Sequence, residues 1–247
     1  MKLSRLAGAI LLANVSLGMA SVYAADAPTL KDVLGASGIT ITGYVDAAYT
    51  HLDAQTYRDD GTGSPIATFG PNYFDENNSG ANNAFALKQA SITIAKQPSD
   101  GFGALVNLTT GSDATFIHSN GAGANDYDVT QAFVQYAGSG LTVIGGKFNT
   151  LAGAEVIAPT GNTNISRSIA FLNALPFTHT GVRVSYAPAS NVTLYLGSNN
   201  GWDAQKDTNK SKTTELGISF TPTDMISAAV YAYSGGEGSP AQTRTLI

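Results

Sequence analysis

Apolar and polar residues alternate strictly in two neighbouring stretches of the chain, residues 179–186 and 192–199. In the first stretch the apolar phase consists of Thr180, Val182, Val184 and Tyr186, and the polar phase of His179, Gly181, Arg183 and Ser185. The two stretches flank Pro188-Ala189-Ser190-Asn191, a cluster of residues that favour tight turns. A period of two on both sides of a turn predicts a β-hairpin with one apolar face and one polar face.

The same alternation recurs along the chain and predicts about nine strands of about ten residues each, a length that crosses a bilayer when the strands are tilted. The expected strands are 38–50, 85–96, 102–110, 130–137, 141–148, 179–187, 192–199, 215–221 and 226–234. In the second strand the apolar phase slips between Leu87 and Ile92, which is compatible with a β-bulge.

The connections between these strands alternate in length. Short turns follow Lys96, Ala137, Ala187 and Thr221, and long polar loops follow Thr50, Thr110, Asn149, Asn199 and Ser234. A β-sandwich has no reason to sort its loops in this way, whereas an outer-membrane barrel has short periplasmic turns at one rim and longer external loops at the other. The pattern therefore predicts an all-β protein, an antiparallel up-and-down transmembrane β-barrel.

The beginning of the chain differs from the rest. Residues 1–24 combine two basic residues, Lys2 and Arg5, with an apolar run at 6–19 and small residues before position 25, which predicts a secretory signal peptide. Residues 25–37 are expected to form a short N-terminal periplasmic segment. There Thr29 and Asp32 have the spacing of a helix cap, and a short helix and a disordered leader both remain open. Residues 38–247 are the expected barrel domain.

Composition narrows the function classes. Removal of residues 1–24 leaves 11 basic and 18 acidic residues, a net charge of −7 that argues against a nucleic-acid partner. The chain has no Cys, so neither disulfides nor thiolate metal ligands are expected. Only 13% of the residues are charged and 27 are Gly, which is typical of many short strands joined by loops.

Short motifs in the second half resemble a known family. In order, they are Gly146-Lys147-Phe148, Gly153-Ala154-Glu155, Asn164-Ile165-Ser166-Arg167-Ser168, His179-Thr180-Gly181-Val182-Arg183 and Asn200-Gly201-Trp202-Asp203. Their order and spacing resemble those of the OmpL-like β-barrel porin-2 family, and the resemblance covers most of the chain from Gly38 onward. It implies a Gram-negative outer-membrane barrel that mediates diffusion, and it implies no catalytic residue.

One feature departs from a closed single-chain barrel. Such barrels need an even strand number and usually end in a strand that closes with an aromatic residue, but this chain ends in Ala241-Gln242-Thr243-Arg244-Thr245-Leu246-Ile247. Because an unpaired strand edge is costly in hydrocarbon, we expect the barrel domain to be incomplete at its C-terminus, with further strands beyond Ile247.

The candidate pore lining consists of charged and polar residues on the water-facing phase of their strands and, for Lys147 and Arg167, in or beside the loop at 150–177. The candidates are Asp46, Lys147, Arg167, His179, Arg183 and Glu215. Opposed charges in a pore order water and penalise apolar solutes, and plain solvation of a polar lumen is the open alternative. Candidate aromatic residues at the membrane interfaces are Tyr49, Tyr136, Tyr186, Trp202 and Phe220. For Trp202, a sugar-stacking role in its loop is the second interpretation.

The sequence therefore predicts a porin in the outer membrane, with the lipid bilayer and small polar solutes as partners and with no cofactor. A secreted or periplasmic β-sandwich that binds a ligand is one alternative. A barrel hydrolase is another: Ser166 or Ser168 would be the nucleophile with His179 and Asp203, although no G-x-S-x-G motif is present. His51, His118 and His179 lie far apart in the sequence, which argues against a metal site.

Overall fold

The computed structural model describes residues 28–50, 57–59, 65–67, 84–120, 126–223, 225–238 and 240–247. The expected signal peptide therefore lies outside the described residues. The chain divides into two compact units, residues 1–33 and 34–247. Within the described residues, no helix is both long enough and apolar enough to cross a membrane.

The first described element is the helix α2 (Leu30–Ser37). Its start is a reciprocal cap: the Thr29 backbone N–H donates to Asp32 Oδ2 at 2.9 Å, and the Asp32 backbone N–H donates to Thr29 Oγ1 at 3.3 Å. A hydrogen bond from the Thr29 hydroxyl to Asp32 Oδ2 at 2.7 Å, together with the one from the Thr29 backbone N–H, lowers the pKa of the Asp32 carboxyl. The spacing of Thr29 and Asp32 therefore corresponds to a real helix cap.

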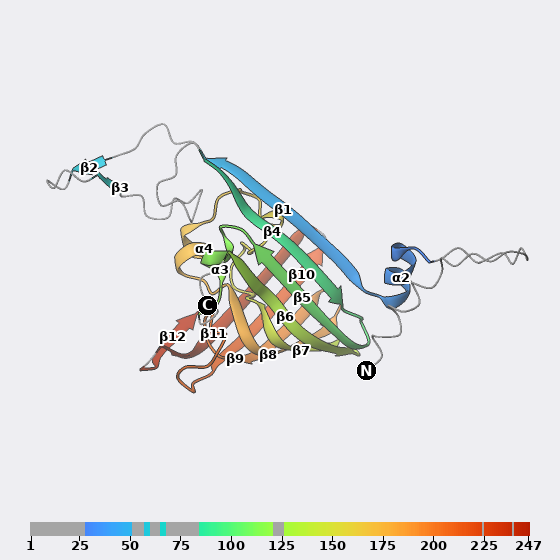
Figure 1. Ribbon diagram of the computed structural model, residues 1–247. Coiled ribbons are helices and arrows are strands. Elements are labelled where there is room, and N and C mark those ends of the chain that lie inside the picture. Colours follow the sequence, from blue (N-terminus) through green and yellow to red (C-terminus); the bar gives the residue numbers. More distant parts are fainter. Residues whose placement is uncertain are drawn as a thin grey trace, which may run out of the picture. The chain divides into compact units, whose positions relative to one another are not determined.

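Ten of the described strands form one antiparallel sheet in which neighbours in sequence are neighbours in space (Figure 1). They are β1 (Thr40–Thr50), β4 (Ala84–Lys96), β5 (Gly101–Thr110), β6 (Tyr127–Gly138), β7 (Leu141–Asn149), β8 (Thr178–Ala189), β9 (Val192–Asn199), β10 (Thr213–Thr223), β11 (Ile226–Glu237) and β12 (Gln242–Leu246). The short strands β2 (Tyr57–Asp59) and β3 (Pro65–Ala67) pair with each other. The single meander confirms the predicted up-and-down antiparallel fold and is not the pair of packed sheets that a sandwich requires.

The predicted strand count was one too low. Residues 235–247 were expected to form a loop and the end of the chain, but β11 continues to Glu237 and β12 pairs with it from Tyr233↔Leu246 to Glu237↔Gln242. The sequence signal was weak because Gln242-Thr243-Arg244-Thr245-Leu246 has no apolar alternation. Backbone hydrogen bonds hold this strand in the sheet.

The predicted bulge lies at Lys88. In the pairing of β1 with β4, Asp46 opposes Gln89 while the next residue, Ala47, opposes Leu87, so Lys88 is an extra residue of β4 in this register. The extra residue turns Lys88 and Gln89 to the same side, and both side chains are buried. This explains why the apolar phase of the sequence slips at this point.

The two faces of the sheet have the reverse of the polarity of a soluble protein. Large apolar side chains point outward and are exposed, for example Val45 at 73% and Ile94 at 46%. The opposite face carries buried polar and charged side chains, among them Gln89, Arg183 and Glu215. An apolar exterior around a polar interior is the arrangement of a membrane β-barrel.

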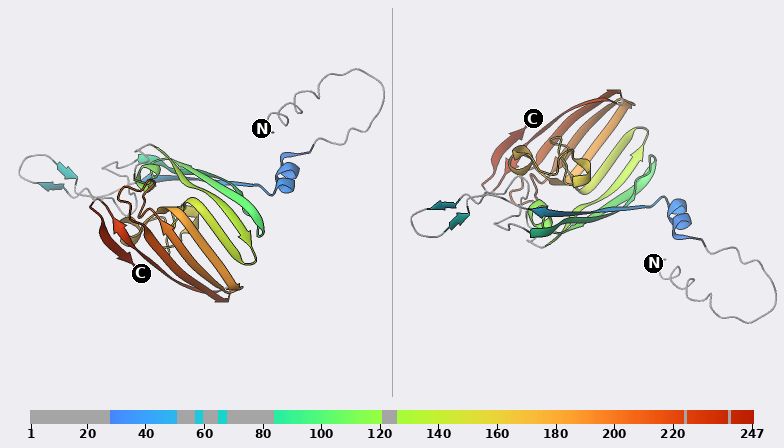
Figure 2. Two further views of the ribbon diagram at one scale, coloured as in Figure 1. Left: turned by 90° about the horizontal axis from the view of Figure 1, so that it is seen from below. Right: turned by 90° about the horizontal axis from the view of Figure 1, so that it is seen from above.

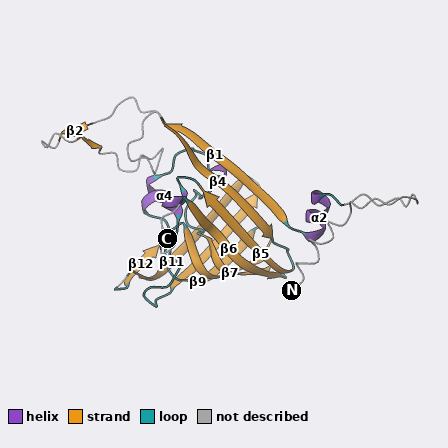
Figure 3. Ribbon diagram, viewed as in Figure 1, coloured by secondary structure: helices purple, strands orange, loops and turns teal. Residues whose placement is uncertain are grey.

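Short turns connect the strands at one end of the sheet, and longer segments connect most of them at the other, which we call the long-loop end. The connection between β11 and β12 at that end is short, residues 238–241, so the long loop expected after Ser234 is not found there. Three short helices occur in these longer segments: α3 (Ala114–Ile117), the 3-10 helix η1 (Pro159–Gly161) and α4 (Ile169–Asn173). The sheet curves around them (Figures 2 and 3). They contribute to a small cluster of buried apolar side chains: Ile117, Ile157, Phe171 and Phe177, with Phe116 and Leu172 packed against it.

Candidate functional site

A buried ion pair crosses the inner face of the sheet between β8 and β10. The Arg183 Nε lies 2.5 Å from Glu215 Oε1, and Arg183 Nη2 lies 2.9 Å from Glu215 Oε2, so the pair is bidentate. Glu215 is fully buried. Two parallel charge-assisted hydrogen bonds of this kind offset part of the cost of removing both charges from water.

The strand between the two partners contributes a glycine at the point where they meet. Gly197 of β9 opposes Arg183 on one side and Glu215 on the other. A Cβ at this position would lie 3.1 Å from the Cβ of Glu215, which is tighter than ordinary contact. The absence of a side chain therefore allows the ion pair to span β9.

Arg183 also contacts the last two residues of β7. Its guanidinium carbon lies 4.3 Å from the ring centroid of Phe148, and its Nη2 donates to the carbonyl oxygen of Asn149 at 3.1 Å. The cation–π contact and the hydrogen bond fix the guanidinium in a single position. The same side chain thus connects the ion pair to the end of β7, where the segment 150–177 begins.

His179 and Tyr233 form a second anchor for this segment. Their rings stack at a centroid distance of 5.0 Å, and both side chains are fully buried. The Tyr233 hydroxyl accepts a hydrogen bond from the Leu151 backbone N–H at 3.0 Å. The His179 ring nitrogens lie 3.1 Å from the Gly201 carbonyl oxygen and 3.3 Å from Thr150 Oγ1. These residues therefore connect β8 and β11 to the segments after β7 and after β9.

Lys147 takes part in another buried ion pair. Its Nζ lies 3.1 Å from both carboxylate oxygens of Asp128 and donates to the Val129 carbonyl oxygen at 2.7 Å. Lys147 lies within β7, inside the sheet, and Asp128 lies in the neighbouring strand β6. The charge of Lys147 is therefore compensated locally.

A third group of polar side chains lies on β4 and the segments that face it. Lys88 Nζ lies 3.1 Å from Asp113 Oδ1, and Gln89 Nε2 donates to Asp113 Oδ2 at 2.9 Å. Gln89 also donates to the Ile157 carbonyl oxygen at 3.3 Å, and Arg167 Nη2 donates to the same oxygen at 2.8 Å. Because Leu151 bonds to β11 and Ile157 bonds to β4, the segment 150–177 lies across the concave side of the sheet.

The sequence-predicted candidates thus share one environment but not one set of contacts. Asp46, His179, Arg183 and Glu215 lie on the inner face, Arg167 lies in the segment held against it, and Lys147 is buried within β7 against Asp128. The structure pairs Arg183 with Glu215 and places His179 against Thr150, at the start of the segment 150–177. Pattern reasoning missed the partners of the other charges, Asp113 and Asp128, and the anchor Tyr233. The alternation of β11 placed Tyr233 on the inner face, but gave no signal of its partner.

Asp203 fastens the start of β8 from the loop after β9. Its Oδ1 accepts hydrogen bonds from the backbone N–H groups of Phe177 at 2.7 Å and Thr178 at 2.9 Å. Burial raises the pKa of the Asp203 carboxyl to about 6, against the lowering effect of these two hydrogen bonds. The role of this carboxyl in the structure is to hold two backbone groups.

The hydrolase alternative requires a chain of hydrogen bonds that runs from a serine through His179 to Asp203. Ser168 is instead the N-cap of α4, where its Oγ accepts from the Phe171 backbone N–H at 3.1 Å, and it also bonds to Glu155. The ring nitrogens of His179 face Gly201 and Thr150. The structure therefore does not assemble the Ser-His-Asp arrangement that was considered from the sequence.

Four of the five candidate interface aromatics are exposed on the outer face: Tyr49, Tyr136, Tyr186 and Phe220. Tyr49 packs on Phe85 near the long-loop end at a centroid distance of 4.8 Å, and Tyr136 packs on Phe102 near the short turns at 5.0 Å. Aromatic residues thus lie near both ends of the outer face, as girdles at two membrane interfaces do.

Trp202 differs from this group. Its ring lies 4.4 Å from the guanidinium carbon of Arg244, which belongs to β12. Arg244 opposes Gly235, two residues along from the buried Tyr233, so it shares the inner face with Tyr233. The expectation that Trp202 is an outer girdle residue is therefore corrected: a cation–π contact and the course of its loop hold it on the inner side.

Comparison with family models gives one match. The model described as putative beta-barrel porin-2, OmpL-like, matches residues 38–247. Comparisons with curated proteins and with solved structures find no match. The matched region contains every strand of the sheet and all the contacts described for the candidate site.

Proposed function

Because the chain belongs to the putative beta-barrel porin-2, OmpL-like family, we propose that it forms a water-filled channel for passive diffusion of small polar solutes. The family implies a β-barrel of the porin type in the Gram-negative outer membrane. Passive diffusion through such a channel uses neither a catalytic residue nor a cofactor.

The observation that carries the proposal is the inverted polarity of the sheet. An exposed belt that contains Val45, Ile94 and Val182 would be costly in water, at about 25 cal/mol for each Å² of apolar surface. The same surface is the natural partner of acyl chains. A face lined with Gln89, Arg183 and similar groups would be costly in lipid and is suited to water.

The inner contacts support selection by size and polarity. The segment 150–177 lies across the concave side and is held there by Tyr233 and Gln89. A segment of this kind reduces the cross-section open to a solute. The buried charges beside it are paired, Arg183 with Glu215 and Lys88 with Asp113, so we propose that solutes meet a polar wall of compensated charge rather than a ring of one sign.

The test is conductance, in a planar lipid bilayer, of the mature protein together with any strands that the complete gene product carries beyond Ile247. We expect discrete current steps in salt solution, together with gel mobility that changes on heating, because a folded barrel resists detergent until it is heated. Protein unfolded by boiling is the matched control and should give no steps. A chain that stays soluble and monodisperse without detergent and gives no current would contradict the proposal and favour the soluble alternative.

A further inference from the structure

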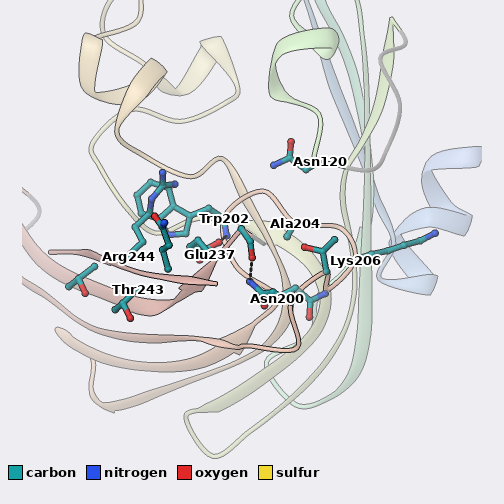
Figure 4. Close-up of a pocket in the computed structure, with 13 residues that line it drawn as sticks. Asn120, Asn200, Trp202, Ala204, Lys206, Glu237, Thr243 and Arg244 are labelled. Atoms are coloured by element: carbon teal, nitrogen blue, oxygen red, sulfur yellow. Dashed lines mark hydrogen bonds between the residues drawn. The ribbon is translucent and has the colours of Figure 1, made fainter. Parts of the chain in front are cut away.

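A cavity of about 880 Å³ opens at the long-loop end of the sheet, apart from the charge pairs described above. Figure 4 shows the residues that surround it. They come from three places that are distant in the sequence: Asn120 after α3, the loop after β9 from Asn200 to Asn209, and the adjoining ends of β11 and β12. The cavity is thus built by the meeting of separate connections.

One wall of the cavity is formed by Trp202 and Arg244, which lie against each other in Figure 4. Stacking on an indole uses the flat face of a guanidinium and leaves the N–H groups around its edge free. Among the described residues, no carboxylate lies within ion-pair distance of Arg244. Arg244 is therefore held in position with its donors available.

Several other side chains in the lining have hydrogen-bonding capacity that no described residue uses. These are Asn120, Asn200 and Gln242. Together they offer amide groups that can both donate and accept. Such a lining complements a solute that carries several hydroxyl groups.

The charge of the lining favours an anion. Two cations, Arg244 and Lys206, stand against one carboxylate, Glu237. That carboxylate already accepts hydrogen bonds from the Trp202 backbone N–H at 3.1 Å and from Thr213 Oγ1 at 2.7 Å. Lys206 extends away from Trp202 in Figure 4, so Arg244 is the fixed cation and Lys206 adds positive charge from a flexible stem.

We propose that this cavity binds a small polyhydroxylated anion of the sugar-acid class. The carboxylate of the solute meets the free edge of Arg244, its hydroxyl groups meet the side-chain amides, and its C–H surface meets the uncovered part of the Trp202 ring. The proposal rests on the channel function proposed above, since external loops of a barrel line the entrance that a solute reaches first.

The chain offers a direct probe, because Trp202 is its only tryptophan. Titration of the full chain in detergent with glucuronate should change the tryptophan fluorescence in a saturable way. Glucose lacks the carboxylate and acetate lacks the hydroxyl groups, so each should bind at least about tenfold more weakly than glucuronate. Equal affinity for glucuronate and glucose, or the absence of a saturable response to glucuronate, would overturn the proposal.

Variants identify the residues responsible. Arg244→Gln should weaken glucuronate binding about tenfold, while Lys96→Gln, an exposed lysine at the short-turn end, should leave it unchanged. Asn200→Ala removes an amide that contacts a hydroxyl group of the solute and leaves the Trp202 ring unchanged. It should weaken the binding of both glucuronate and glucose. If Arg244→Gln and Asn200→Ala, each shown to be folded by heat-modifiable mobility, bind like the unchanged chain, the cavity is not the site.

Conductance measured on the same preparation separates this proposal from the channel function. Saturable binding without current steps supports the cavity as a sugar-acid site and contradicts the channel. Current steps without saturable binding support the channel and overturn the sugar-acid site.

Discussion

The inner and outer faces of β8 differ completely although they alternate residue by residue. Arg183 is buried and bound to Glu215, Phe148 and the backbone of Asn149. The next residue, Val184, lies on the outer face between its cross-strand neighbours Val143 and Leu196. The outer face needs only to be apolar, whereas the inner face needs a specific partner for each charge. The two faces should therefore respond to substitution by different physical rules.

The largest effect is expected from removing one partner of the inner ion pair. Glu215→Ala leaves the Arg183 charge buried and without its carboxylate, which should lower the free energy of unfolding by about 3 to 5 kcal/mol. Urea unfolding in lipid vesicles, followed by heat-modifiable mobility, measures the loss. The double variant Arg183→Met with Glu215→Leu removes both charges and should recover most of it. A loss of similar size in the double variant would show that the pair does not act as a unit.

A charge on the outer face should cost slightly less. Val184→Arg places a guanidinium against acyl chains and should destabilise the folded protein by about 2 to 4 kcal/mol if the site lies near the middle of the bilayer. Ser185→Arg is the matched control on the inner face and should insert normally. The same vesicle unfolding assay compares them. Equal tolerance of the two substitutions would contradict a lipid-facing outer surface.

The difference between the faces also appears at glycines. Gly197→Ala on the inner face places a methyl group 3.1 Å from the Cβ of Glu215, so the ion pair must shift, at a cost of about 1 to 3 kcal/mol. Gly145 opposes Val182 on the outer face, and a Cβ there would meet nothing within 4 Å. Gly145→Ala should change stability by less than about 0.5 kcal/mol. If urea unfolding shows similar effects at both positions, the ion pair does not require the absence of a side chain at position 197.

The outer face was more predictable from the sequence than the inner one. Strand phase depends only on the period of two, so the positions of Val184 and Arg183 followed from local pattern. The pairing of Arg183 with Glu215 depends on the register of three strands and on Gly197 between them, and no local signal encodes it. β12 was missed because its residues do not alternate in polarity.

The segment 150–177 also shows that local sequence pattern does not predict contacts between distant parts of the chain. Its polar composition predicted a long loop, and its helices are indeed short. However, Ile157, Phe171 and Phe177 are buried together with Ile117 from another connection. Such a cluster forms only after the sheet has curved, since it joins residues that the sequence separates by two strands, β6 and β7. Trp202 was misplaced for a similar reason, because its partner Arg244 lies on a strand without a sequence signal.

The smallest effect is expected from the titration of Asp203, which fastens the inner segments and has no counterpart on the outer face. Its pKa is about 6 in the folded protein against an ordinary value of 3.8, because burial outweighs the hydrogen bonds to its carboxylate. Among the charges near it, Lys147 favours the ionised form and Glu237 opposes it. Below pH 3.8 the carboxyl is neutral in both states. Between 3.8 and about 6 the unfolded chain releases its proton while the folded chain keeps it.

The folded chain therefore binds more protons in this window, and the Asp203 contribution to the free energy of unfolding falls as pH rises from 3.8 to about 6 and is constant above that. Asp203→Asn keeps an acceptor for the backbone N–H groups of Phe177 and Thr178 but cannot titrate. The difference in unfolding free energy between the unchanged protein and this variant should fall across the window, because only the unchanged protein loses stability there. Parallel pH curves for the two proteins would show that the Asp203 carboxyl is already ionised in the folded state, with the inner loops accessible to water.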